Sequence, residues 1–437
     1  MMRFFRKYHK ILGLFCSFFI IMSALSGIVL NHRKAFAPVD ISRSLLPRSY
    51  HYSNWNNASV KGSFRLSADS ILLYGGAGIW LTDSLHSRFS DFSAGLSEGA
   101  DNRTTNKIRR TSSGEIFAVT SFDLYRLNPQ ARAWERLSEQ AGIVERIADL
   151  EARADTLVVL TRSQAIVALY PFRDFRPMQL LQPQGYKAEA TLFRTLWLLH
   201  SGELFGLPGQ LIVGALGLCM IILCLTGLLY SFCPSIIRRR KQRHLSAKKS
   251  IKTMKKSLLW HNKTGATLLL FLLVLAISGM FLRPPLMIAI IRAKVKPVPG
   301  SVLASANPWH DKLRCIRYDA RRAEWLLYAS SGFYAMAGLE TEPSPLLRTP
   351  PVSVMGVTVL EESSAGWLVG SFAGLYGWNR LNLILRCYEK IFSHAEVEKL
   401  SVPCSLIYHD ESLYRNHSAK YTSMIFPTCR ATTSAGR

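Results

Sequence analysis

Three long stretches of the chain consist of apolar and small residues without a charged side chain. They run from Ile11 to Leu30, from Leu204 to Phe232 and from Gly265 to Leu282. An α-helix rises about 1.5 Å per residue, so each stretch is long enough to cross the roughly 30 Å hydrocarbon core of a membrane. The pattern predicts three transmembrane helices, which would form an α-helical membrane bundle.

Outside these stretches, short apolar segments alternate with small or polar turns. Five of them have the form of a β-hairpin, in which an apolar strand, a tight turn and an apolar-aromatic strand follow one another. They are Ile71–Leu81, Ile116–Leu127, Leu157–Tyr170, Trp325–Ala337 and Trp367–Trp378. Equivalent positions recur after 42 to 45 residues, as from Ile79 to Leu124 and from Phe333 to Leu375, which is close to the period of about 40–50 residues of propeller blades. We expect an all-β external domain with propeller-like blades, and a plain β-sandwich is the alternative.

The charges of the chain are concentrated beside the apolar stretches. The chain has 54 Lys and Arg residues against 29 Asp and Glu, which gives a formal net charge of +25. Residues 1–10 and 234–264 contain 4 and 11 basic residues and no acidic residue. By the positive-inside rule both segments are cytoplasmic, so residues 31–203 and 283–437 face outward. This topology predicts a multi-pass protein of the cell inner membrane, with a cytoplasmic N-terminus and a periplasmic or extracellular main domain.

The position of the basic segment between two spans also indicates what it contacts. A net charge of +25 by itself suggests a nucleic-acid-binding protein. A basic loop between two membrane helices is instead typical of a topology determinant that contacts anionic lipid headgroups. We therefore expect membrane lipid as a partner and no nucleic acid.

These patterns divide the chain into seven segments. They are 1–33, the N-terminus and first transmembrane helix; 34–190, the first part of the external β domain; 191–233, the second transmembrane helix; 234–264, the basic cytoplasmic loop; 265–292, the third transmembrane helix; 293–380, the second part of the β domain; and 381–437, an irregular tail that reads as a truncated end. Ala35-Phe36-Ala37 resembles a cleavage site, so a removed signal peptide is the alternative interpretation of the first stretch.

The first and third apolar stretches repeat one arrangement of residues. The matching strings are His9-x3-Gly13 with His261-x3-Gly265, and Ser26-Gly27 with Ser278-Gly279. Residues four apart lie on the same face of a helix, so the glycine leaves room for a flat ligand beside the imidazole. The second stretch ends with a related pair, Thr226-Gly227. The repeat indicates that these histidines share a role.

Depth in the membrane sorts four histidines into two pairs. His9 and His261 lie at the cytoplasmic ends of their helices, whereas His32 and His200 lie just beyond the spans on the external side. Along one helix His9 and His32 are about 34 Å apart, so each pair needs its own centre. Neutral imidazole is an axial ligand of haem iron, and two bis-histidine b haems stacked across the membrane would fit this arrangement. The alternative is that all four are ordinary polar residues at a membrane surface.

Four segments resemble the helix signatures of the PepSY-associated transmembrane family. They are Arg6–Gly13, Leu25–Arg33, Leu199–Gly206, and His261–Gly265 through Pro285. The family includes inner-membrane haem-b reductases that pass electrons to ferric siderophores outside the membrane. The resemblance therefore implies a transmembrane ferric reductase that acts in iron acquisition on a siderophore or another ferric chelate. The chain departs from the family in lacking a recognisable small α/β PepSY module and a fourth helix.

The sequence carries no motif for other redox cofactors or for hydrolysis. It has no C-x-x-C-H for covalent haem, and Gly75-Gly76-Ala77-Gly78 is not followed by a phosphate-binding lysine. Electrons would therefore come from quinol or a redox partner protein. No catalytic residue can be named. The alternative function is a haem-free membrane-anchored sensor or assembly protein whose external β domain binds a ligand or partner.

Overall fold

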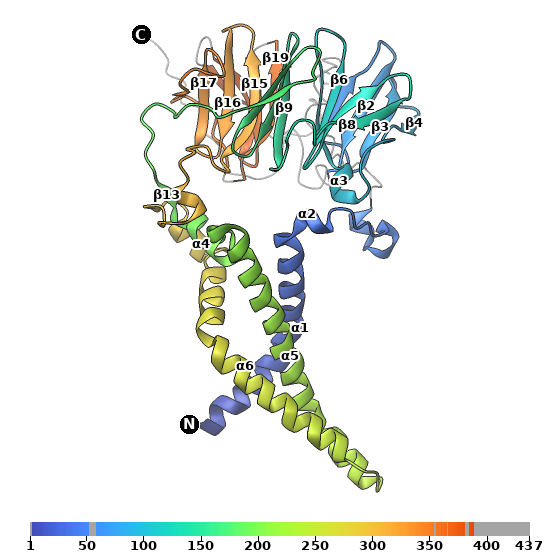
Figure 1. Cartoon of the computed structure of the whole chain (residues 1–437), viewed down its shortest axis with the longest axis vertical. Helices are drawn as coiled ribbons and strands as arrows, with labels where there is room; N and C mark the ends of the chain where they lie inside the picture. Colours follow the sequence, from blue (N-terminus) through green and yellow to red (C-terminus); the bar gives the residue numbers. More distant parts are fainter. Residues whose placement is uncertain (1, 52–57, 354, 365, 381–383, 389–437) are drawn as a thin grey trace, which may run out of the picture.

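The computed structural model describes residues 2–51, 58–353, 355–364, 366–380 and 384–388. A β domain lies at one end of the molecule, and three long helices extend from it (Figure 1). We call the helix ends beside the β domain proximal and the opposite ends distal. The expected irregular tail, residues 381–437, lies outside the described residues apart from one short strand at 384–388.

The three apolar stretches form helices, as predicted. They lie in α1 (Met2–Asn31), α5 (Gly206–Gln242) and α6 (Lys248–Met280). Candidate membrane spans are Tyr8–Asn31, Glu203–Gln242 and Lys248–Met280. Large apolar side chains are exposed along all three helices, which is the surface expected of helices that contact lipid rather than water. The chain is therefore a membrane protein.

Helices α5 and α6 form an antiparallel hairpin whose distal end carries the basic segment (Figure 1). Helix α5 continues through Pro234, and α6 begins at Lys248, so most of residues 234–264 are helical rather than loop. Lysine and arginine are good helix formers, and this segment contains no glycine. The chain reverses at residues 243–247, and α1 packs along α5.

Short elements lie where the long helices meet the β domain (Figure 1). They are α2 (Arg33–Phe36), α3 (Ala100–Arg103), α4 (Leu192–Ser201), α7 (Leu286–Ile290), and the 3-10 helices η1 (Arg43–Leu45), η2 (Arg48–Tyr50), η3 (Glu203–Phe205) and η4 (Val302–Ala304). Gly202 ends α4 with φ 82°, and a Cβ atom there would lie 2.3 Å from the carbonyl oxygen of Gly209. Only glycine fits this position, so the chain bends sharply between α4 and α5.

Five four-stranded antiparallel sheets form the β domain, and each sheet pairs only consecutive strands. The first three sheets contain β1 (Gly62–Arg65), β2 (Ser70–Gly75), β3 (Gly78–Asp83) and β4 (Phe89–Asp91); β5 (Thr105–Arg110), β6 (Ile116–Thr120), β7 (Leu124–Asn128) and β8 (Ala133–Arg136); and β9 (Ile147–Arg153), β10 (Thr156–Thr161), β11 (Ala165–Leu169) and β12 (Phe175–Met178). The last two contain β15 (Leu313–Asp319), β16 (Glu324–Ala329), β17 (Gly332–Met336) and β18 (Ser344–Pro345); and β19 (Val357–Ser363), β20 (Gly366–Ser371), β21 (Gly374–Asn379) and β22 (Ile384–Tyr388).

The five predicted hairpins are confirmed as the two middle strands of these sheets. They are β2–β3, β6–β7, β10–β11, β16–β17 and β20–β21. The second strand of each sheet is mostly buried, and in the three middle sheets, as in β6 and β10, another sheet packs on either face. This explains why the strands read as continuous apolar runs rather than as an alternation of apolar and polar residues.

Four hydrophobic cores lie between successive sheets. Phe117 and Leu150, for example, join the second sheet to the third, and Val158 and Leu327 join the third to the fourth. The third and fourth sheets are separated in sequence by the whole helical hairpin, so the domain is built from both external segments. A two-stranded ribbon of β13 (Ala190–Thr191) and β14 (Lys294–Val295) joins the chain where it leaves and re-enters the domain.

A buried network of ion pairs joins the first strands of four sheets. Its members are Lys107 and Arg109 of β5, Asp149 and Glu151 of β9, Arg317 of β15 and Glu361 of β19. Arg317 Nη1 lies 2.5 Å from Asp149 Oδ2, and both side chains are only 7% exposed. Burial alone would raise the pKa of Asp149, but Arg317 and Lys107 hold it below its ordinary value. The three cations and three carboxylates balance, so the network holds the sheets together.

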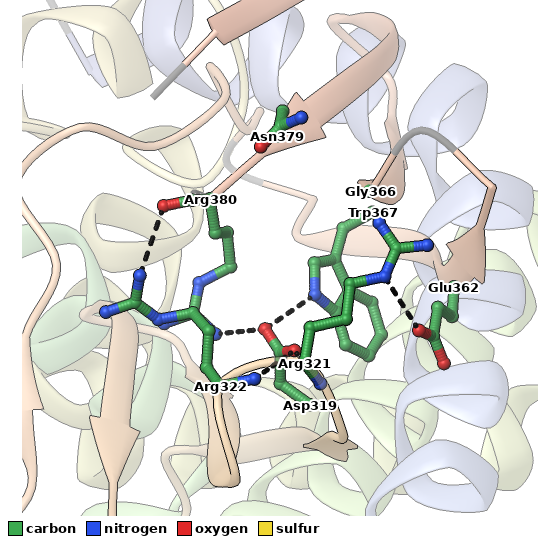
Figure 2. A pocket seen from close by; sticks show the side chains of 8 residues that line it. All are labelled: Asp319, Arg321, Arg322, Glu362, Gly366, Trp367, Asn379 and Arg380. Carbon is green, nitrogen blue, oxygen red and sulfur yellow. Dashed lines mark hydrogen bonds and ion pairs between the residues drawn. The ribbon is translucent and has the colours of Figure 1, made fainter. Parts of the chain in front are cut away.

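A cavity between the fourth and fifth sheets is similarly structural (Figure 2). Its volume is about 10 Å³, which is room for about one water molecule. Asp319 accepts hydrogen bonds there from Arg380 Nη1 at 2.8 Å and Trp367 Nε1 at 3.0 Å. The cavity is too small for an organic ligand, and its side chains satisfy one another.

Candidate functional site

The distal histidines of α1 and α6 lie against each other. The ring centroids of His9 and His261 are 6.0 Å apart, and the ring planes are inclined by 58°. The two residues are 252 positions apart in the sequence, and they come from the first and the last of the three long helices. The structure therefore brings together the pair that depth in the membrane suggested.

His261 is held in one orientation by helix α5. Its Nδ1 lies 3.0 Å from the carbonyl oxygen of Leu223 and 3.3 Å from Thr226 Oγ1. Because a carbonyl oxygen only accepts, Nδ1 carries the proton, and Nε2 of the neutral ring keeps its lone pair. Gly227 completes the contact, since a Cβ atom there would lie 3.2 Å from the His261 ring.

His200 of α4 is held in the same way by the proximal end of α6. Its Nδ1 lies 3.0 Å from the carbonyl oxygen of Leu275 and 3.2 Å from Ser278 Oγ. A Cβ atom on Gly279 would lie 2.9 Å from the ring, which is too close without a shift. Leu275 to Gly279 therefore repeats the spacing of Leu223 to Gly227, with a carbonyl, a hydroxyl and a glycine around each imidazole.

His32 lies at the proximal end of α1, beside α5. Its Nε2 would be 3.6 Å from a Cβ atom on Gly214. The residue before it, Asn31, donates from Nδ2 to the carbonyl oxygen of Ser201 at 2.6 Å, and Ser201 directly follows His200. The backbones that carry His32 and His200 are thus tied together, although no contact between the two rings is recorded in the described part of the chain.

The glycines that contact the histidine rings lie on neighbouring helices, whereas Gly13 and Gly265 of the repeat have no histidine close to them among the described residues. No atom lies within 4 Å of a Cβ position on Gly13, and Gly265 faces Leu223 at 3.7 Å. Gly227 contacts the ring of His261, and Gly279 contacts the ring of His200. We call each set of carbonyl, hydroxyl and glycine around an imidazole a socket. The repeated string Leu-x-x-Ser/Thr-Gly is the sequence signal for a socket, but only the packing of the helices shows that each socket receives a histidine from another helix.

The orientation of these imidazoles fits axial ligation of a haem. Histidines that bind a metal through one ring nitrogen commonly donate from the other to a carbonyl or carboxylate, which fixes the ring and makes it a better ligand. A metal–imidazole bond is about 2.0–2.1 Å long, so two imidazoles on opposite sides of one ion stand roughly 6 Å apart between ring centres. His9 and His261 have this separation. His261 and Ser278, the contact of His200, are about 25 Å apart along α6, so the two levels are separate.

Comparisons with known proteins assign the first half of the chain to a family. No curated protein sequence matches the chain. A sequence profile of the PepSY-associated TM region matches residues 2–232, which is more than half of the chain and includes α1, the first three sheets, α4 and most of α5. The chain therefore belongs to the PepSY-associated transmembrane family.

Proposed function

We propose that the protein carries electrons outward across the inner membrane and reduces a ferric chelate, such as a ferric siderophore, on the external side. His9 with His261 would hold one b haem at the distal level, and His32 with His200 would hold a second at the proximal level. The observation that carries the proposal is the contact of His9 with His261, whose Nδ1 is bonded to the carbonyl of Leu223.

The protein's own residues prepare both levels for a metal-bound macrocycle. The carbonyls of Leu223 and Leu275 accept Nδ1–H, so Nε2 of each ring would hold the iron, and the glycines let the rings approach the neighbouring helix. A bound haem supplies one-electron oxidation and reduction at its iron. The apolar surfaces of the helices exclude water around it, which favours a defined potential at each level.

The proposed direction of transfer follows from charge. The basic segments lie at the distal ends of the helices, so the positive-inside rule places those ends in the cytoplasm and the β domain in the periplasm or outside the cell. Quinol or a redox partner protein would supply electrons at the distal level. Anionic headgroups would contact the basic hairpin.

The β domain would hold the acceptor above the proximal level. We propose that its five sheets are blades of a propeller-like domain, which is consistent with their consecutive strand order and with the hydrophobic cores between neighbours. The turns of such blades alternate between two faces, and a ligand would bind at the face that lies beside the helix ends.

Reoxidation of the haem tests this function. The protein, purified from haem-replete cells and reconstituted in liposomes, is reduced, and a ferric chelate is added on the side of the β domain while haem absorption is followed. The proposal predicts rapid reoxidation with one ferrous ion formed per haem oxidised, and loss of this rapid phase in His32→Ala. Haem that stays reduced in the presence of ferric siderophores and other ferric chelates would reject the reductase function.

A further inference from the structure

Basic side chains gather where the β domain meets the proximal ends of the helices. We call them the outer basic cluster: Arg33, Lys61, Arg146, Arg162, Arg194 and Arg314. They come from α2, α4, the start of β9 and β15, and loops of the first and third sheets. The helical and the β parts of the molecule both contribute to this cluster, so it belongs to their junction.

Two of these arginines share a single carboxylate, and a third contacts the backbone of the same residue. Arg162 Nε lies 2.7 Å from Asp311 Oδ1, and Arg194 Nη2 lies 2.8 Å from Asp311 Oδ2. Arg314 Nη1 donates to the backbone carbonyl of Asp311 at 2.9 Å. Arg194 Nε is buried and has no hydrogen-bond partner among the described residues. One carboxylate therefore serves two guanidinium groups, and donor capacity is left over.

The rest of the cluster continues from these arginines to the end of α1. Arg33 is paired with Asp101, and Lys61 Nζ donates to Asn106 Oδ1 at 2.8 Å. Burial, followed by the charges of Arg146 and Arg33, lowers the pKa of Lys61 to about 8. The shift has this sign because burial and nearby cations both disfavour the charged form of the lysine.

Positive charge exceeds negative charge in the cluster. The carboxylates around it are Asp101, Glu145, Glu203 and Asp311, which makes four against six cations. The side chains stay partly open, with Arg162 29% exposed and Asp311 38% exposed. A partly desolvated excess of guanidinium groups favours an anion that can accept several hydrogen bonds at once.

The cluster also lies beside both proximal histidines. Arg33 directly follows His32 in the chain. Arg194 precedes His200 by six residues on α4, which is about 9 Å along the helix axis. An anion bound by Arg194 would thus lie close to the level from which the proposed function delivers electrons.

Resting on the proposed function, we propose that the outer basic cluster binds the electron acceptor, and that this acceptor is a ferric chelate of net negative charge with carboxylate or similar anionic oxygen groups. Arg162 and Arg194 would bind these oxygens in the bidentate geometry that guanidinium groups favour. Each ferric ion takes up one electron and becomes ferrous, while the carrier at the proximal histidines is oxidised by one electron. A neutral or cationic ferric hydroxamate would lack this recognition.

Binding of a redox-inactive chelate tests the proposal without requiring electron transfer. Gallium(III) citrate is titrated against the full chain in nanodiscs of zwitterionic lipid, with a cationic gallium hydroxamate for comparison. We expect binding of the citrate chelate alone, weakened at least tenfold in Arg162→Gln and Arg194→Gln, and unchanged in Arg238→Gln at the far end of α5. Affinity in the unchanged protein should also fall as salt is added, which does not depend on the folding of any variant.

The lipid headgroup offers the same chemistry from another source. Gallium citrate would then fail to bind in zwitterionic nanodiscs, and the arginine variants would change only the amount of anionic lipid that co-purifies. This result would assign the cluster to lipid headgroups and overturn the proposal. Equal binding of both chelates would also overturn it. Citrate binding by a chain that takes up no haem would support the anion site while rejecting the proposed function, so the two fail separately.

Discussion

Each oriented histidine in the helical region depends on a glycine of another helix as much as on its own position. His200 faces Gly279 across α4 and α6, and His261 faces Gly227 across α5 and α6. In both cases a leucine carbonyl four residues before the glycine accepts the Nδ1 proton. A side chain at either glycine would move the imidazole away from its carbonyl and change its direction.

Gly279→Ala is therefore expected to disturb the proximal level selectively. The added Cβ would lie 2.9 Å from His200 Cε1, so the ring must shift. We expect haem content to fall from about two to about one per chain, as measured by pyridine haemochrome absorption. Gly338→Ala in the β domain is the control, because a Cβ atom there would make only an ordinary contact, 3.6 Å from Thr341 Cγ2. Equal haem content in the two variants would contradict the role of the glycine.

The pairing of His9 with His261 could be predicted from the sequence, but the residues that surround the rings could not. Counting residues along the helices was enough to place His9 and His261 at one depth. The sockets around them could not be derived in the same way, because they depend on which helix packs beside which. Ser26-Gly27 carries the same signature as Ser278-Gly279, yet nothing lies within 4 Å of a Cβ position on Gly27.

Between the strands of the β domain, buried ion pairs join neighbouring sheets at fixed positions, in addition to their hydrophobic packing. The network of β5, β9, β15 and β19 lies where the first strands of four sheets approach one another. Asp149 accepts from Arg317 Nη1 at 2.5 Å and from the backbone amide of Ile316 at 3.0 Å. Removing one partner leaves a buried charge without compensation.

Asp149→Asn is expected to destabilise the β domain by about 3–5 kcal/mol at pH 7, because Arg317 loses its closest counter-ion. The pKa of Asp149 is lowered in the folded protein, so its contribution is complete above the ordinary value of 3.8 and is lost as pH falls below that value. Thermal unfolding followed by tryptophan fluorescence at pH 7 and pH 3.5 should show a smaller pH dependence in Asp149→Asn. Glu139→Gln, whose side chain is 91% exposed, is the control. An unchanged pH dependence in the aspartate variant would contradict the role of the pair.

The hairpins of the β domain were predictable, whereas the joints between sheets were not. Runs such as Leu157–Leu160 identify a buried strand by their apolar residues alone. The ion pair of Lys107 and Glu361 joins residues 254 positions apart, so no local pattern indicates it. In the sequence, the strands that carry these residues look like ordinary edge strands with polar side chains. The helical extension of α6 back to Lys248 also escaped the hydropathy pattern, because a basic helix outside the membrane carries no apolar signal.

At the scale of the whole molecule, charge and position divide the protein into three levels. The basic hairpin lies at the distal end, the uncharged spans in the middle, and the β domain with its outer basic cluster at the proximal end (Figure 1). The excess of Lys and Arg beside the distal ends predicts that these ends stay in the cytoplasm.

A pair of inserted protease sites checks this orientation. One site is placed at Ser246 in the distal turn and the other at Leu347, which is 95% exposed in the β domain. Protease added to spheroplasts should cleave only at position 347, and protease added to inside-out vesicles should cleave only at position 246. The reverse pattern would place the β domain in the cytoplasm and contradict outward electron transfer.

The most direct measurement of the central claim is the haem content of the purified chain. A reduced-minus-oxidised absorption spectrum, with pyridine haemochrome quantitation, is recorded for protein from haem-replete cells. We expect two b haems per chain, and one in His9→Ala or His261→Ala, with His244→Ala unchanged as the control. A flat spectrum, or full haem content in single alanine variants of all four histidines, would contradict haem ligation and leave a membrane-anchored β domain without a redox centre.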